Sequence, residues 1–97
     1  MLDFYLIHDE QITQESPSDL EFIDNLDDKT FQNLKTKKII PDNYDYFSDF
    51  RWNTTVIKQI LNIASNQETQ NDTDIQQLKQ ILSIADNRKS GLIAFAD

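Results

Sequence analysis

Several kinds of residue are scarce or missing in this chain of 97 residues: there is no cysteine, one glycine and two prolines, and basic residues are few. Without cysteine the chain forms no disulfide, no thiol nucleophile and no cysteine-ligated zinc or iron–sulfur site. One glycine does not make the glycine-rich loops that hold phosphates in nucleotide-binding proteins.

Long hydrophobic runs are also missing. No apolar run approaches the roughly 20 residues that span a bilayer. The chain starts acidic, without the basic region and the long apolar stretch of a signal peptide. We therefore expect a soluble, complete and cytoplasmic protein, with residues 1–97 forming a single compact domain, because domains typically have about 100–150 residues.

Charge is the most informative bulk property. The net charge is −8. Residues 1–50 carry twelve acids and four lysines, residues 51–97 carry five of each sign, and nine acids precede the first basic residue, Lys29. A negative field repels nucleic-acid phosphates and anionic lipids and attracts basic proteins. We expect a basic protein partner, no direct nucleic-acid binding and no membrane binding. The alternative is that the acids only keep a small protein soluble.

The two ends of the chain carry short apolar runs. Residues 4–7 and 92–96 are rich in aromatic, branched or small apolar side chains and predict buried strands at about residues 3–8 and 91–96. We expect these strands to lie side by side, with their relative direction open. A two-stranded ribbon is marginal alone, so a third strand from residues 38–40, or pairing between two copies, would complete a better sheet.

Between the strands the pattern predicts about four helices, and therefore an α+β fold. Ser18 and Glu21 form a capping box for the first helix, on which Leu20, Ile23 and Leu26 share a face. Asp27 or Asp28 caps the second helix, which ends before Pro41.

The last two helices form the clearest feature of the pattern. They are expected at about residues 53–66 and 72–87, and a polar connection at residues 65–71 favours an antiparallel helical hairpin. Each carries an apolar stripe at helical spacing: Val56, Ile57, Ile60, Leu61 and Ala64 on one, and Ile75, Leu78, Ile81, Leu82 and Ala85 on the other. From both patterns we expect a mostly buried core of Phe4, Leu6, Ile60, Leu61, Leu78, Leu82, Ile93 and Phe95.

The sequence gives little support for a catalytic site or a metal-binding site. His8, the one histidine, follows the first strand and is flanked by Asp9 and Glu10. A neighbouring carboxylate can make a histidine a general base, but no recognisable nucleophile or second histidine accompanies it. We expect a surface histidine and no enzyme.

Metal binding is the other chemistry that the sequence suggests. Asp42, Asp45 and Asp49 lack the alternating oxygens and the glycine of a calcium loop. We therefore expect no metal and no cofactor.

The segment from residue 44 to residue 52 alternates aromatic and acidic side chains, and we call residues 42–52 the aromatic–acidic loop. Tyrosine, tryptophan and arginine are enriched at interface hot spots. The predicted partner-binding residues are Asp42, Asp45 and Asp49, which would meet lysine or arginine, and Tyr44 and Tyr46, which would be partly exposed contact anchors. The alternative is that Phe47, Phe50 and Trp52 fill the core.

In size, charge and its aromatic–acidic loop, the chain resembles the small acidic inhibitors that bacteria make against their own toxins. The resemblance covers no alignable motif and transfers no residue. It implies a non-enzymatic, immunity-type or inhibitory protein that binds a basic partner. The alternative function is a structural or regulatory subunit that self-associates, as a homodimer for example, through a strand edge or a helix face. A small enzyme using His8 is the third choice.

Overall fold

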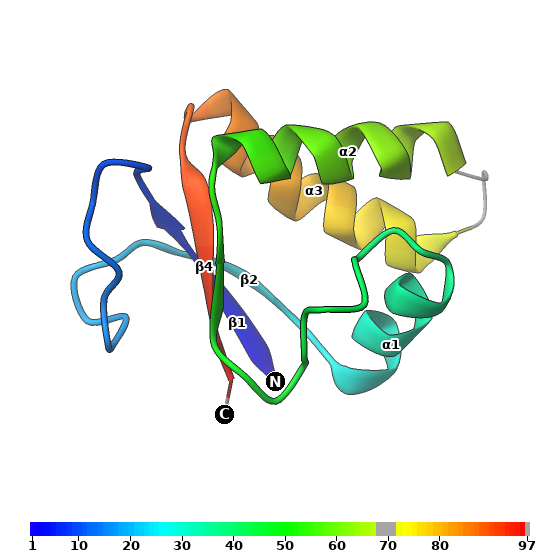
Figure 1. Ribbon diagram of the computed structural model, residues 1–97, viewed down its shortest axis with the longest axis horizontal. Helices are drawn as coiled ribbons and strands as arrows, with labels where there is room; N and C mark the ends of the chain where they lie inside the picture. The colour runs from blue at the N-terminus through cyan, green and yellow to red at the C-terminus, as the bar shows by residue number, and fades with distance from the viewer. Residues whose placement is uncertain (68–71, 97) are drawn as a thin grey trace.

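The computed structural model describes residues 1–67 and 72–96, which form a four-stranded antiparallel sheet with helices against one face (Figure 1). The strands are β1 (Leu2–Ile7), β2 (Phe22–Leu26), β3 (Phe50–Trp52) and β4 (Gly91–Ala96), in the order β2-β1-β4-β3. The helices are α1 (Asp28–Thr36), α2 (Thr54–Gln67) and α3 (Thr73–Asn87). The expectation of two strands and about four helices is therefore wrong: the described residues form an α+β fold with four strands and three helices.

The terminal strands β1 and β4 lie at the centre of the sheet. They pair antiparallel along their whole length, with Leu2 opposite Ala96 and Ile7 opposite Gly91. Successive side chains of a strand point to opposite faces, so Leu2 and Phe4 are fully buried in the main core. Tyr5 follows Phe4 in the chain, so its side chain points to the opposite face of the sheet.

Strand β2 replaces the first of the expected helices. The spacing of Leu20, Ile23 and Leu26 suits a helix, but residues 22–26 pair antiparallel with β1, with an irregularity between Phe4 and Tyr5. Without β2, β1 would present a row of unpaired backbone groups at the sheet edge. Pairing therefore decides the local structure, and the proposed capping box starts no helix.

Strand β3 takes the place of the third strand suggested for residues 38–40. It lies on the other edge of the sheet, with Trp52 opposite Leu92 of β4. Ile39 and Ile40 form no strand and are instead fully buried in the core. The end of the aromatic–acidic loop, which the sequence predicts as an ordered loop, is thus part of the sheet.

Helices α2 and α3 lie side by side and run in opposite directions (Figure 1). Residues 68–71 of the expected connection lie outside the described residues. Of the expected core, Leu6, Leu61 and Phe95 are only partly buried. The other members are buried: Phe4, Ile60, Leu78, Leu82 and Ile93. Among residues 1–67 and 72–96, no helix has the length and hydropathy of a membrane-spanning segment.

The N-cap residues of α1 and α3 are both aspartates. Asp27 accepts a hydrogen bond of 2.7 Å from the Thr30 N–H at the start of α1, and Asp72 accepts one of 3.1 Å from the Ile75 N–H at the start of α3. Asp72 also pairs with Lys37, which follows α1. The hydrogen bond from Lys37, followed by the Ile75 backbone N–H, lowers the pKa of Asp72 below its ordinary value. The Thr30 backbone N–H lowers the pKa of Asp27.

These caps predict a dependence of stability on pH. Because the pKa of Asp72 is lower in the folded chain than in the unfolded one, its contribution is fully present above the unfolded pKa of about 3.9. It is lost as the pH falls through the lowered folded pKa. We expect Asp72→Ala to reduce the unfolding free energy by about 1 kcal/mol at pH 7, and the difference from the parent to shrink as the pH falls below about 4. Urea unfolding followed by circular dichroism measures both.

The control for this prediction is Asp19→Ala, which removes an exposed acid with no capping role. Its difference from the parent should be small at every pH. An Asp72→Ala variant whose deficit stays constant from pH 7 to pH 3 would contradict the assignment of a charged cap.

Candidate functional site

The three acids of the aromatic–acidic loop are exposed, and each also takes part in the chain's own structure. Asp42 pairs with Lys38 at 3.0 Å, and this hydrogen bond lowers the pKa of Asp42. Asp45 accepts a hydrogen bond of 3.1 Å from the Phe47 N–H. Asp49 accepts one of 2.8 Å from the Ala96 N–H and so joins the loop to the end of β4. The acids are spread along the loop rather than gathered at one point.

The tyrosines of this loop pack inward. Tyr46 is 9% exposed, with its ring centroid 5.7 Å from that of Phe31. Tyr44 is half-buried, with its ring 5.0 Å from Phe50 and 5.6 Å from Trp52. The expectation of partial exposure is therefore right for Tyr44 and wrong for Tyr46.

The alternative that Phe47, Phe50 and Trp52 fill the core is right for only some of these residues. Phe47 is 69% exposed, whereas Trp52 is fully buried. Phe50 lies between these limits and packs its ring 6.1 Å from Phe4. Phe47, rather than either tyrosine, is the most exposed aromatic side chain of the loop.

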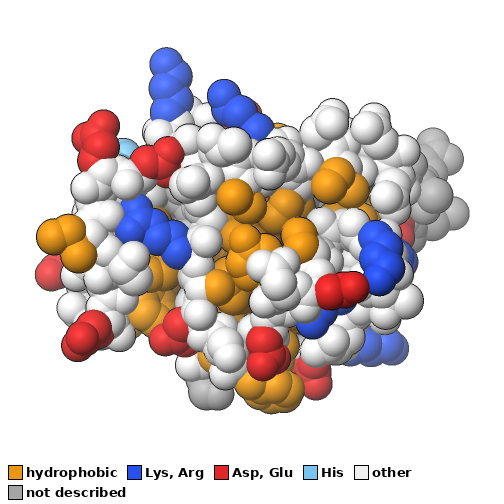
Figure 2. Space-filling model, in the orientation of Figure 1, with side chains coloured by type: hydrophobic (Ala, Val, Ile, Leu, Met, Phe, Trp, Pro, Cys, Tyr) orange, Lys and Arg blue, Asp and Glu red, His pale blue; other side chains and the backbone are white. Residues whose placement is uncertain are grey.

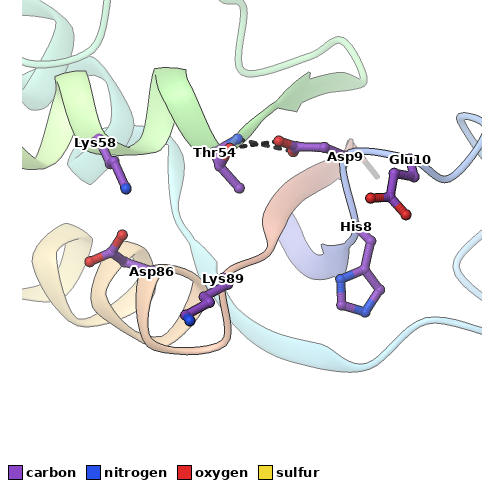
Figure 3. Close-up of a pocket in the computed structure, with 7 residues that line it drawn as sticks. All are labelled: His8, Asp9, Glu10, Thr54, Lys58, Asp86 and Lys89. Carbon is purple, nitrogen blue, oxygen red and sulfur yellow. Dashed lines mark hydrogen bonds between the residues drawn. The ribbon is translucent and has the colours of Figure 1, made fainter.

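A hollow of about 370 Å³ lies where the end of β1 meets the start of α2 and the end of α3 (Figure 3). Asp9 accepts hydrogen bonds there from the Thr54 N–H at 3.0 Å and from the Thr54 hydroxyl at 2.6 Å, which caps α2. Figure 3 shows the imidazole of His8 pointing away from this carboxylate. The lining residues are His8, Asp9, Glu10, Thr54, Lys58, Asp86 and Lys89.

The hollow mixes both signs of charge, and His8 is exposed just after β1, with Glu10 on the same side of the hollow (Figure 3). Of the two flanking carboxylates that suggested a general base, Asp9 uses both oxygens to accept hydrogen bonds from Thr54. Within residues 1–67 and 72–96, no three histidine, aspartate or glutamate side chains gather as a metal ion would require.

The sheet face opposite the helices is crossed by the segment of residues 8–15, which we call the strap. Arg51 on β3 holds it: Nη1 donates to the Gln11 carbonyl at 2.7 Å and to Thr13 Oγ1 at 3.1 Å, and Nη2 donates to the His8 carbonyl at 2.7 Å. Figure 1 places this part of the chain on the side of the sheet away from α2 and α3. Arg51 therefore fixes the strap to the β3 side of the sheet.

The same outer face carries a row of three aromatic side chains that sequence reasoning missed. Tyr5 on β1 lies between Phe22 on β2 and Phe95 on β4, with ring centroids 5.4 and 5.7 Å apart and near-perpendicular rings. Phe22 is 49% exposed. The sequence signal that could have placed Tyr5 on this face is the alternation in β1, where Asp3 and Tyr5 stand between apolar residues that point to the inner face.

A second groove, also of about 370 Å³, begins beside Phe95, between the strap and strands β3 and β4. We call it the strap groove. Phe95 of β4 contributes accessible apolar surface, the buried Ile93 lies behind it, and Glu15 and Asp49 contribute carboxylates. Its lining residues are Thr13, Gln14, Glu15, Asp49, Phe50, Arg51, Ile93 and Phe95.

Comparisons of this chain with protein-family models, with curated proteins and with solved structures find no match.

Proposed function

We propose that this chain is a non-enzymatic interaction protein that binds a basic protein partner, as immunity-type or inhibitory proteins do. The observation that carries the proposal is the run of nine acids before Lys29. Seven of these are exposed: Asp9, Glu10, Glu15, Asp19, Glu21, Asp27 and Asp28. Figure 2 shows acidic side chains along the side of the molecule where residues 8–20 lie in Figure 1.

Few basic groups offset this charge. Arg51 directs its donors at backbone and hydroxyl oxygens of the strap. Arg88 pairs with Glu21 at 3.2 Å, but both side chains are more than half exposed, and exposed pairs contribute little. Surplus negative charge steers a basic partner towards the surface and accelerates encounter.

The aromatic–acidic loop remains part of this proposal. Asp42 and Asp45 are exposed and suit the rim of an interface, where charges act mainly on association. Tyr44 is the better anchor of the two tyrosines because it is less buried than Tyr46, and Phe47 adds an exposed ring, 5.0 Å from that of Tyr46.

Binding kinetics test the proposal. A partner captured from native lysate is purified, and its association and dissociation rates are measured at low and high salt. We expect the association rate constant to fall by on the order of tenfold or more at high salt, since screened charges no longer steer the encounter. If the partner associates equally fast at both salt concentrations, electrostatic attraction is excluded as the basis of binding.

Single variants separate the two roles proposed for the loop. Asp45→Lys should slow association more than it speeds dissociation, whereas Tyr44→Ala should mainly raise the dissociation rate because an anchor acts after encounter. Asp45→Asn is the matched control, because it removes the charge without reversing it. Equal dissociation rates for Tyr44→Ala and the parent would exclude Tyr44 as an anchor.

His8→Ala should leave the affinity for the basic partner unchanged, because the exposed imidazole adds no negative charge to the surface that would attract a basic partner. The same kinetics measure this, with circular dichroism as the check on folding. A folded His8→Ala variant that loses binding would place His8 in the interface, and loss of a catalytic activity would overturn the non-enzymatic proposal.

Self-association is the second candidate, favoured by the edge strand β2 and its 49% exposed Phe22. An exposed strand edge is a template for pairing with another chain. The net charge of −8 opposes it, because two copies repel each other. Sedimentation of the purified protein over a range of concentrations and salts distinguishes a dimer from a monomer.

A further inference from the structure

The strap groove combines the two features that a long basic side chain needs. Lysine and arginine bury their aliphatic stems on apolar surface while the charged head stays polar. Here Phe95 supplies the accessible apolar surface, with the buried Ile93 behind it, and Glu15 and Asp49 supply carboxylates along the same groove. An aromatic ring such as Phe95 also attracts a cation above its face.

The two carboxylates have room for an outside donor. Glu15 is exposed and makes no hydrogen bond or ion pair with the other residues of 1–67 and 72–96. Asp49 uses Oδ1 to accept from Ala96, and Oδ2 takes part in no hydrogen bond within those same ranges. Hydrogen bonds between a charged donor and a carboxylate are stronger than neutral ones.

One residue of the groove lining is itself positively charged, as a bound lysine or arginine would be. Arg51 contributes to its wall, but its guanidinium donates to four oxygens of the strap, the fourth being the Asp9 carbonyl at 3.3 Å. These contacts turn its donors towards the strap, where carbonyl dipoles offset the charge. Arg51 therefore holds the wall in place while Glu15 and Asp49 present the negative charge.

We propose that the strap groove binds a lysine or arginine side chain of the basic partner; this rests on the proposed function and names the surface that performs it. Charge complementarity selects this occupant. A second copy of the chain carries the same net charge of −8, and nucleic acid repels the same carboxylates. The row of Phe22, Tyr5 and Phe95 continues from the groove across β1 to β2, and gives the partner's neighbouring residues an apolar surface.

The test uses the whole chain, labelled with ¹⁵N, and an end-blocked hexa-arginine peptide as the probe. Amide shift changes should concentrate at residues 13–15, 49–51 and 93–95. Glu15→Gln should weaken peptide binding by about two- to fivefold, the effect of one exposed ion pair. Glu10→Gln is the matched control, since it removes the same charge from an exposed position outside the groove. It should change binding much less.

A second variant, Phe95→Leu, keeps apolar bulk and removes the ring, and should also weaken binding. The amide spectrum of each variant shows that it is folded. An end-blocked glycine–serine hexapeptide is the neutral probe and should leave the spectrum unchanged.

The outcomes separate this proposal from the proposed function. If hexa-arginine binds but shifts the amides near Asp42 and Asp45, with Glu15→Gln equal to the parent, the strap groove is excluded and a basic partner stands. If Glu15→Gln and Glu10→Gln weaken binding equally, the peptide senses only overall charge, and the groove is again excluded. If hexa-arginine fails to bind at low salt, or glycine–serine binds as well, both proposals fall. Sedimentation showing a dimer, with the same groove amides shifting on dilution, would make a second copy the occupant.

Discussion

Leu82→Ala should lower the free energy of unfolding by about 2–5 kcal/mol. Leu82 lies on α3 and is fully buried in the main core. Its removal takes away apolar contacts and leaves a cavity that the surrounding helices and sheet fill only in part. Urea unfolding followed by far-ultraviolet circular dichroism measures the loss. For a domain of this size, that loss is a large fraction of the usual stability of about 5–15 kcal/mol.

Ile84 on the same helix provides the matched control, because its side chain is 39% exposed. Ile84→Ala removes a side chain of similar size from the same helix and should cost much less. Leu82→Ala as stable as the parent, or Ile84→Ala as damaging as Leu82→Ala, would contradict the packing of α3 against the core.

The helical hairpin was predictable because its signal is local and repeated. Five apolar residues recur at helical spacing in each helix, and both helices lie within one residue of the expected bounds. The terminal strands were predictable from their continuous apolar runs. Their direction was not, because it depends on how the three helices between them connect the sheet edges.

The two edge strands show where a local pattern fails. In β2, Ile23 and Leu26 are three residues apart, a spacing that fits a helix, yet β1 offers backbone partners that no local pattern reveals. Strand β3 has three residues, too few to show an alternation. Both strands exist because the central pair β1–β4 needs partners on its open edges.

The candidate site was predictable only in its charge. The excess of acids before Lys29 can be read directly, but the strap groove joins residues 13–15, 49–51 and 93–95, which are far apart in the chain. The inward packing of Tyr46 and the exposure of Phe47 depend on where Phe31 lies, so the order of aromatic residues alone could not assign them. Had residues 2–7 been treated as a strand whose side chains alternate between two faces, Tyr5 would have been predicted on the outer face.

Gly91→Ala should destabilise the fold by about 3 kcal/mol, at the upper end of the cost of overpacking. Gly91 opens β4 opposite Ile7 of β1. A Cβ atom there would lie 2.5 Å from the Trp52 carbonyl oxygen and 3.1 Å from the Ile7 carbonyl oxygen. Both are backbone atoms of neighbouring strands, so neither can move aside as the end of a flexible side chain would. Adding the methyl group therefore requires β3 or β1 to shift against β4.

Two measurements check this expectation. Urea unfolding gives the loss of stability, and a Gly91→Val variant should lose more than Gly91→Ala because it adds further volume at the same place. Trp52, the one tryptophan, reports the shift of β3 through its fluorescence. Its buried ring packs 5.5 Å from Phe4, so displacement of β3 should change its emission in the folded variant. Equal stability of Gly91→Ala and the parent, with unchanged emission, would contradict the close approach of β3 and β4 at this position.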